Sequence, residues 1–192
     1  MKDYLSYSQL RLYLENPQEY YLRYELHIKP EPSRAMKFGS IAHSALADRR
    51  VDYRKELNKE GYLPDKVRVI ETALKQITKP KITEKRIRVK YDPIDLLSVF
   101  DAIEDETIRE YKTGSGWWTQ ERVDEALQLT FYAFVYKIWK GRKPKKLVLY
   151  SINSKTGRTK IFETTRNQKH FDDLINKINY AYEGIKNKCW TL

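Results

Sequence analysis

Hydrophobic positions recur along the chain with two periods, and these periods predict a mixture of helices and strands. Apolar residues three and four positions apart predict amphipathic helices, and apolar residues that alternate with polar ones predict half-exposed strands. Helices are expected over residues 4–23 (broken at Asn16-Pro17), 37–50, 53–78 (broken near 61–64), 119–140 and 167–188. Strands are expected over residues 82–91, 96–103, 107–112, 145–154 and 159–164.

Residues at the ends of these segments support the assignment. Ser6 or Ser8 is placed to cap the first helix, Thr119 to cap the longest one, and Gly141 to terminate it. The near-continuous apolar run at 147–152 predicts a strand buried on both faces. The acidic residues 104–106 lie between two apolar arms, which predicts a hairpin.

The order of the segments predicts an α/β fold. Helices come first, followed by three strands, a long helix, two strands and a final helix, and this order fits a small mixed sheet flanked by helices. We expect a single domain over residues 1–192, with a mainly helical N-terminal part (1–80) and a sheet-containing core (82–192).

Composition and charge narrow the functional classes. Hydrophobic residues make up 41% of the 192 residues and charged residues 33%, as in soluble globular proteins. The net charge of +11 favours a polyanionic partner such as nucleic acid, although a basic protein without such a partner remains an alternative. No segment approaches a membrane span, so an intracellular, cytoplasmic protein without a membrane partner is expected.

The predicted hairpin carries the strongest candidate chemistry. Residues two apart in a strand share a face, so Glu110 and Lys112 point one way and Tyr111 the other. If the arms pair, Asp101 lies across from them, and two carboxylates meet an ammonium group. Carboxylates suit Mg²⁺ or Mn²⁺, and a nearby lysine can orient a water or stabilise charge on a phosphate. The competing interpretation is a solvated, salt-bridged hairpin.

Other polar residues lie on predicted helices. His43 is carried by a helix rich in small residues, so a ligand or another backbone can approach it closely. Gln128 and Tyr132 are four residues apart and therefore share a helix face. Structural roles remain alternatives for all three side chains.

Together, these motifs resemble the RecB-type branch of the PD-(D/E)XK nuclease superfamily. Five ordered segments carry the resemblance: 5–21, Gly39 to His43, Asp101, Glu110-Tyr111-Lys112-Thr113-Gly114, and Gln128 with Tyr132. The resemblance implies a restriction-endonuclease-like core and a metal-dependent DNA nuclease, with an exonuclease favoured over an endonuclease. The substrate would be DNA, with the choice between single and double strands left open. It implies roles in recombination, repair, replication or CRISPR-type processing.

The resemblance also implies a role for each residue. His43, Asp101 and Glu110, with the carbonyl of Tyr111, would hold one or two Mg²⁺ or Mn²⁺ ions. Lys112 would position the attacking water and stabilise the transition state, and Gln128 and Tyr132 would support the site or contact the DNA backbone.

Some positions depart from the family pattern. Ser98 stands where glycine is common, and Asn16 stands where iron–sulfur members have their first cysteine. Cys189, the sole cysteine, cannot replace the missing cluster ligands, so no iron–sulfur cluster is expected. Helicase motifs are absent, so a helicase or recombination partner would be a separate chain. The alternatives are a DNA-binding module with an idle nuclease fold and an assembly subunit.

Overall fold

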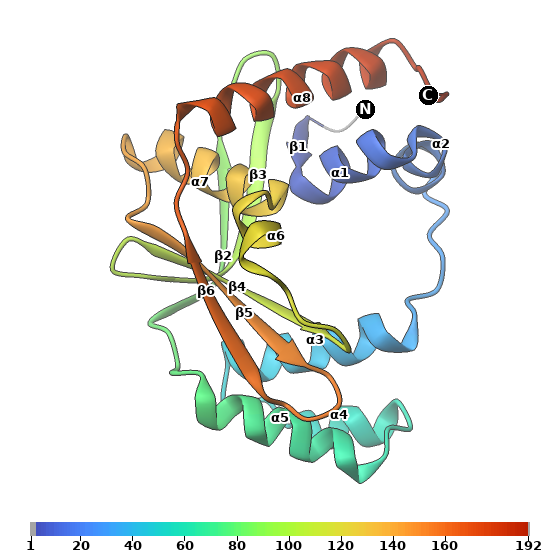
Figure 1. Ribbon diagram of the computed structural model, residues 1–192. Helices are drawn as coiled ribbons and strands as arrows, with labels where there is room; N and C mark the ends of the chain where they lie inside the picture. The colour runs from blue at the N-terminus through green and yellow to red at the C-terminus, as the bar shows by residue number, and fades with distance from the viewer. Residues whose placement is uncertain (1–2, 192) are drawn as a thin grey trace.

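The computed structural model describes residues 3–191, which form a six-stranded mixed sheet with helices on both of its faces (Figure 1). The strands follow the order β1-β3-β4-β5-β6, and β2 pairs with β3. The predicted α/β class and mixed sheet are therefore confirmed. The bounds are β1 (Tyr4–Ser6), β2 (Ile82–Val89), β3 (Asp95–Glu104), β4 (Thr107–Gly114), β5 (Lys146–Asn153) and β6 (Thr159–Thr164).

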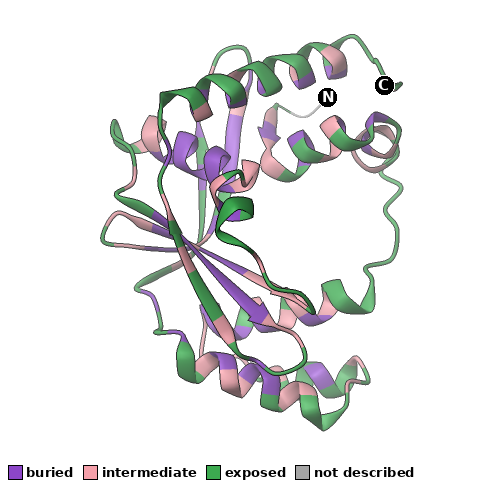
Figure 2. Ribbon diagram, in the orientation of Figure 1, coloured by how far each residue is buried: buried purple, intermediate pink, exposed green. Residues whose placement is uncertain are grey.

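The predicted hairpin is formed by β3 and β4, which run antiparallel. Its loop residues, Asp105 and Glu106, have positive φ angles of 47° and 64°, a conformation whose twist matches that of the flanking strands. β4 then runs parallel to β5 along its whole length. Residues 148–152 of β5 are buried, as the apolar run predicts for a strand covered on both faces (Figure 2).

The helices form two layers. On one face of the sheet lie α1 (Tyr7–Glu15), α2 (Pro17–Tyr20), α7 (Leu127–Lys140) and α8 (Gln168–Lys186) (Figure 1). On the other lie α3 (Arg34–Ala47), α4 (Tyr53–Lys59) and α5 (Pro64–Gln76). The short π-helical turn η1 (Tyr21–Glu25) follows α2, and residues 26–33 connect one layer to the other. Among the described helices, none is both long and apolar enough to cross a membrane.

Each layer has its own core. Phe100, Phe131 and Leu147 belong to the large cluster on the side of α7, and Leu46 and Tyr150 belong to a cluster on the side of α3 and α5. Figure 2 shows buried residues concentrated in the sheet and on the inner sides of the helices. The site residues described below lie where elements of the two layers meet the sheet.

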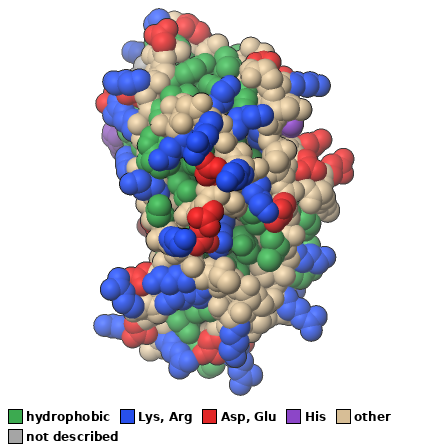
Figure 3. Space-filling view, turned by 90° about the vertical axis from the view of Figure 1, so that its left-hand side faces the viewer, with side chains coloured by type: hydrophobic (Ala, Val, Ile, Leu, Met, Phe, Trp, Pro, Cys, Tyr) green, Lys and Arg blue, Asp and Glu red, His purple; other side chains and the backbone are tan. Residues whose placement is uncertain are grey.

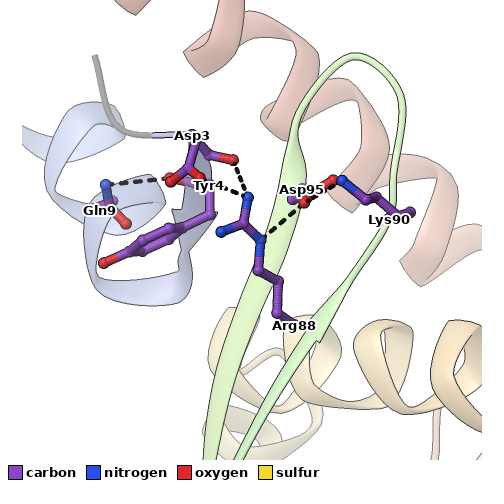
Figure 4. Close-up of polar contacts among 6 residues, drawn as sticks. All are labelled: Asp3, Tyr4, Gln9, Arg88, Lys90 and Asp95. Atoms are coloured by element: carbon purple, nitrogen blue, oxygen red, sulfur yellow. Dashed lines mark hydrogen bonds and ion pairs between the residues drawn. The ribbon is translucent and has the colours of Figure 1, made fainter.

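The start of the chain differs from the prediction. Residues 4–6 form β1 instead of helix, and they pair in parallel with residues 95–97 of β3. The Ser6 side chain then caps α1, which confirms one of the two predicted capping residues. Arg88 on β2 donates hydrogen bonds of 2.9 Å to both the carbonyl and the carboxylate of Asp3, and one of 2.8 Å to Asp95 (Figure 4). These long-range bonds hold β1 in place. The strand is only three residues long, so its sequence pattern is too short to predict it.

The prediction of one continuous helix over 119–140 was wrong. Thr119 caps a short helix, α6 (Gln120–Asp124), and α7 begins separately at Leu127. Arg166 is buried between them and donates hydrogen bonds of 3.0 Å to the carbonyl of Val123 and 3.2 Å to that of Ala126. Its guanidinium binds carbonyl groups at the break, which stabilises the interruption. Gly141 terminates α7 with a φ of 70°, as predicted.

The third helix also has different limits from those predicted. It begins at Arg34, three residues earlier than expected, because the Ser33 side chain accepts a hydrogen bond from the Met36 amide. It ends at Ala47, before the predicted end at residue 50. The predicted break in 53–78 is confirmed between α4 and α5.

Candidate active site

The candidate site lies where β3 and β4 separate. β3 pairs with β2 along one edge, and its other edge pairs with β1 at residues 95–97 and with β4 at residues 102–104. The β3–β4 pairing thus ends at Ala102 and Arg109, and Asp101 and Glu110 are the next residues on the two strands. The separation leaves the Tyr111 amide free to donate a 2.9 Å hydrogen bond to Oδ2 of Asp101. We call this opening the fork.

The helix α3 brings His43 to the fork from one side. Ala42, Ala45 and Leu46 are buried and hold this helix in its layer. Gly39 allows the close approach to β4, because a Cβ atom there would lie 3.0 Å from Oγ1 of Thr113. As a result, Nδ1 of His43 lies 3.5 Å from Oδ2 of Asp101.

The helix α7 supplies Gln128 and Tyr132 from the other side. Nε2 of Gln128 donates hydrogen bonds of 2.7 Å to Oε1 of Glu110 and 2.9 Å to the hydroxyl of Tyr132. Oε1 of Gln128 accepts a 2.7 Å hydrogen bond from Nζ of Lys112. That ammonium lies 2.6 Å from Oε1 of Glu110, so a single amide orients both members of the ion pair.

Glu110 is the least solvated charged group of the fork. Its side chain is 2% exposed, and Oε2 has no hydrogen-bond partner among the described residues. Burial, together with the nearby charge of Asp101, raises the pKa of Glu110 to about 7 despite the opposing effect of Lys112. An unpartnered, buried carboxylate oxygen is costly to maintain, which is consistent with a site that receives a cation.

The pKa values of Asp101 and His43 shift in the opposite sense from what burial alone would produce. Burial raises the pKa of Asp101, but the hydrogen bond and charge of His43 outweigh burial and hold this pKa below its usual value. Burial likewise lowers the pKa of His43, and the hydrogen bond and charge of Asp101 raise it above its usual value. Asp101 is thus the carboxylate of the fork that stays ionised at neutral pH.

A cavity of about 500 Å³ opens beside Asp101 and His43, and it contains a carboxylate that the sequence analysis missed. The β2–β3 register pairs Thr83 with Ala102 and Lys85 with Phe100, which places Glu84 opposite Asp101. Glu84 lines the cavity, and burial and the charge of Asp101 raise its pKa. Its sequence signal is weak: it is the sole acid in the otherwise basic segment 81–90.

The structure therefore brings most of the predicted site residues together. Asp101 contacts His43 and the Tyr111 amide, and Glu110, Lys112, Gln128 and Tyr132 form one hydrogen-bonded network. The ring of Tyr111 points to the opposite side of the sheet, where it packs in the cluster that contains Leu46. Within residues 3–191, no three His, Cys, Asp or Glu side chains already surround one point as a metal site would require.

The positions that depart from the family pattern lie in different surroundings. Asn16 caps α2, because its side chain accepts a 3.0 Å hydrogen bond from the Glu19 amide. Cys189 is exposed near the end of the chain. The hydroxyl of Ser98 is buried and has no partner among the described residues. Asn16 therefore has a local structural function in place of the cysteine.

Comparison with known proteins agrees with the fold. A family model described as the PD-(D/E)XK nuclease superfamily matches residues 4–191. A crystal structure of a candidate exonuclease from Eubacterium rectale has a TM-score of 0.71 and 13% sequence identity, covering 97% of this chain and 82% of that chain. The crystal structure of SSO0001 has a TM-score of 0.50 and 13% identity, covering 95% of this chain and 77% of that chain.

At such low identity, the structural likenesses establish the fold alone. None of the curated proteins compared with the sequence matches it. The match to the family model, however, spans nearly all of the chain. The chain belongs to the PD-(D/E)XK nuclease superfamily.

Proposed function

We propose that this protein is a divalent-metal-dependent deoxyribonuclease of the RecB-like type, which acts as an exonuclease on single-stranded DNA. The observation that carries the proposal is the convergence at the fork of Asp101, the partly unpartnered carboxylate of Glu110 and the ammonium of Lys112. Carboxylates beside a lysine suit phosphodiester hydrolysis, in which negative charge develops on the phosphate.

The donor groups of the fork fit Mg²⁺ or Mn²⁺. Oε2 of Glu110 has no partner among the described residues, and Asp101 and His43 offer an oxygen and a nitrogen on the adjoining strand and helix. Together with the carbonyl of Tyr111, these groups would form the ligand set, and carboxylates select hard cations. A cation bound there supplies a water of lowered pKa and neutralises charge on the scissile phosphate.

The remaining residues prepare the site for that chemistry. Gln128 fixes the distance between Lys112 and Glu110, because its amide bonds to both. Lys112 thereby presents its ammonium group at the fork, where it stabilises negative charge that develops on the phosphate. Tyr132 orients Gln128 through their 2.9 Å hydrogen bond. Burial raises the pKa of Tyr132 well above its usual value, so its hydroxyl keeps its proton.

The charge of the chain supports DNA as the substrate. The net charge is +11, and Lys and Arg side chains are distributed over the whole of the face drawn in Figure 3, with Asp and Glu among them. Cations of this kind neutralise phosphates and release counterions. If a motor is needed to feed the strand, a helicase or recombination partner on a separate chain would provide it.

The alternative is a DNA-binding or assembly subunit with an idle nuclease fold. The ion pair of Glu110 and Lys112 and the hydrogen bonds of Gln128 favour an enzyme, because they maintain a costly buried charge beside the fork. An idle subunit would gain stability by losing that charge.

The test is digestion of end-labelled linear and circular DNA, single- and double-stranded, with Mg²⁺, Mn²⁺ or EDTA. We expect cleavage of linear single strands with either metal and none in EDTA. Cleavage in excess chelator would exclude the metal mechanism. Equal rates on circular and linear strands would show an endonuclease, and the absence of cleavage in every condition would favour the idle subunit.

A further inference from the structure

A second cavity, of about 620 Å³, lies next to the fork and is separate from the groups assigned to the metal. It is lined by the first residues of α3, the loop before α5, the first turn of α5, the end of β4 and the loops that follow β4 and β5. Asp65, on the first turn of α5, is the carboxylate among its lining residues, and it forms no ion pair with Arg34 or Lys66. Thr113 and Gly114, which directly follow Lys112, belong to its wall. Neighbouring side chains of a strand point to opposite faces, so Lys112 faces α7 and Thr113 faces α3. A strand of DNA bound at Lys112 would therefore reach this cavity around the end of β4.

Two cations of this cavity have no carboxylate partner among residues 3–191. Arg34 donates a 2.5 Å hydrogen bond to the carbonyl of Gly61, and Lys66 donates one of 2.6 Å to the carbonyl of Ser154. The nearby Lys37, in contrast, forms a 2.9 Å ion pair with Glu60. Carbonyl groups orient Arg34 and Lys66 without neutralising them, so both charges remain available to an anion.

Aromatic rings form another part of the wall. The guanidinium of Arg34 lies 4.9 Å from the ring centre of Tyr62, and the ammonium of Lys66 lies 5.0 Å from that of Phe38. The two rings pack edge to face, with their centres 5.8 Å apart. The exposed side chain of Leu63 adds apolar surface. Cations beside aromatic and apolar surface match a ligand that carries both a phosphate and a base.

We propose that this cavity binds the terminal nucleotide of a DNA strand, with its end phosphate beside Arg34 and Lys66. This inference rests on the proposed function for the identity of the strand. The volume suits a single nucleotide, and volumes of this size are typical of small-ligand sites. The cavity would then recognise a phosphorylated end and place the adjoining phosphodiester at the fork.

The test measures binding in EDTA, so that no cleavage occurs. Internally labelled single-stranded oligonucleotides with a 5′ phosphate, a 3′ phosphate or two hydroxyl ends are titrated by fluorescence anisotropy. We expect one of the phosphorylated strands to bind the wild type about tenfold more tightly than the hydroxyl strand, the scale of one charge-assisted contact. Arg34→Ala and Lys66→Ala should each remove most of that preference.

A matched control is Lys75→Ala, which removes the same charge from an exposed position of the same helix as Lys66. This variant should keep the preference for a phosphorylated end, because Lys75 does not line the cavity and contributes only to the general attraction to phosphates. Ala35→Trp fills the cavity without a change in charge, and it should weaken binding of linear strands but not of circular ones. Melting temperatures of all variants identify any that fail to fold. If Lys66→Ala fails to fold, the variants at the exposed positions Arg34 and Ala35 still test the proposal.

Equal binding of phosphorylated and hydroxyl ends by the wild type would overturn the inference. So would an equal loss of linear and circular binding in Arg34→Ala, which would indicate a contact along the strand instead of at its end. If the protein shows the end preference but no metal-dependent cleavage, the proposed function is contradicted and the assignment of the cavity is supported. If the protein cleaves DNA but shows no end preference, only the assignment of the cavity is contradicted.

Discussion

Lys112 and Glu110 form an ion pair in which the side chain of Glu110 is 2% exposed and that of Lys112 is 32% exposed. The buried partner is held rigidly, while the lysine reaches toward the open side of the fork. This asymmetry is what a charge-stabilising group requires, because the ammonium can contact a phosphate without leaving Glu110. It also makes the contribution of Lys112 separable from that of the metal ligands.

Lys112→Ala should reduce the single-turnover cleavage rate by about 10²-fold or more, or about 3 kcal/mol, while DNA affinity changes little. The reason is that the lysine stabilises charge that develops in the transition state. Excess Mn²⁺ should not rescue this variant, whereas it should partly rescue Asp101→Ala, which loses a metal ligand. The measurement is a rapid-quench assay beside a binding titration. A rate near that of the wild type would mean that the ion pair is only structural.

His43→Ala should weaken Mn²⁺ binding more than it lowers the melting temperature. The imidazole is 27% exposed and contacts Asp101 at 3.5 Å, so its removal leaves a small cavity but takes away a nitrogen donor. Calorimetric Mn²⁺ titration and a melting scan distinguish the two effects. His27→Asn, at an exposed position with a φ of 59° that asparagine tolerates, is the control and should change neither. A lower melting temperature with unchanged Mn²⁺ affinity would assign His43 to the core.

Mn²⁺ affinity should rise with pH through the region of pH 7, because Glu110 has a pKa of about 7 and must lose its proton to bind the cation. Asp101, whose pKa lies below its usual value, is already ionised there. Calorimetry in buffers of different ionisation enthalpy should show proton release near neutral pH, to which Glu110 and His43, whose pKa is also raised, both contribute. Glu110→Gln should reduce this release, and a release equal to that of the wild type would assign the titration to His43 alone.

The same shift has a consequence for the metal-free protein. Its native state keeps the Glu110 proton to about pH 7, whereas an unfolded chain releases it near the usual value of 4.5. Between these values the native state binds more protons, so the contribution of Glu110 to stability falls as the pH rises.

Arg166→Ala should lower the free energy of unfolding by about 3 kcal/mol, because several hydrogen-bond acceptors in the core lose their donor. Besides the carbonyls of Val123 and Ala126, the guanidinium bonds Oγ1 of Thr130 at 2.7 Å. Burial lowers the pKa of Arg166 to about 10. Urea denaturation measures the loss. Arg158→Ala, at an exposed position, should have little effect, and equal stability of the two variants would contradict the argument.

Much of the fold was predictable because its signals are local. Alternation in 107–112 and the acidic turn indicate the hairpin, and the spacing of Gln128 and Tyr132 places them on one helix face. The resemblance to a known family then identifies the remaining site residues as candidates. The chemical roles of these residues stay predictions, since geometry shows their proximity and not their action.

What the sequence did not predict depends on residues far apart in the chain. The break before α7 is stabilised by Arg166, which lies on a different segment. Glu84 reaches the site through the register between β2 and β3, and a single acid in a basic strand carries no periodic signal. The cavity with Arg34 and Lys66 is assembled from three separate parts of the chain.

The fork has a consequence for how much change the hairpin can accept. Beyond the last β3–β4 pair, β2 positions Asp101 from the outer edge of β3, and β5 positions Glu110 from the outer edge of β4. The spacing of the two carboxylates is set by the adjoining β3–β4 pairs and by the hydrogen bond from the Tyr111 amide to Asp101, and not by the loop that joins β3 to β4. Extra residues inserted between Asp105 and Glu106 would lengthen the tip of the hairpin and leave that spacing as it is. The loop is thus a place where the chain can vary, or be joined to another domain, independently of the chemistry.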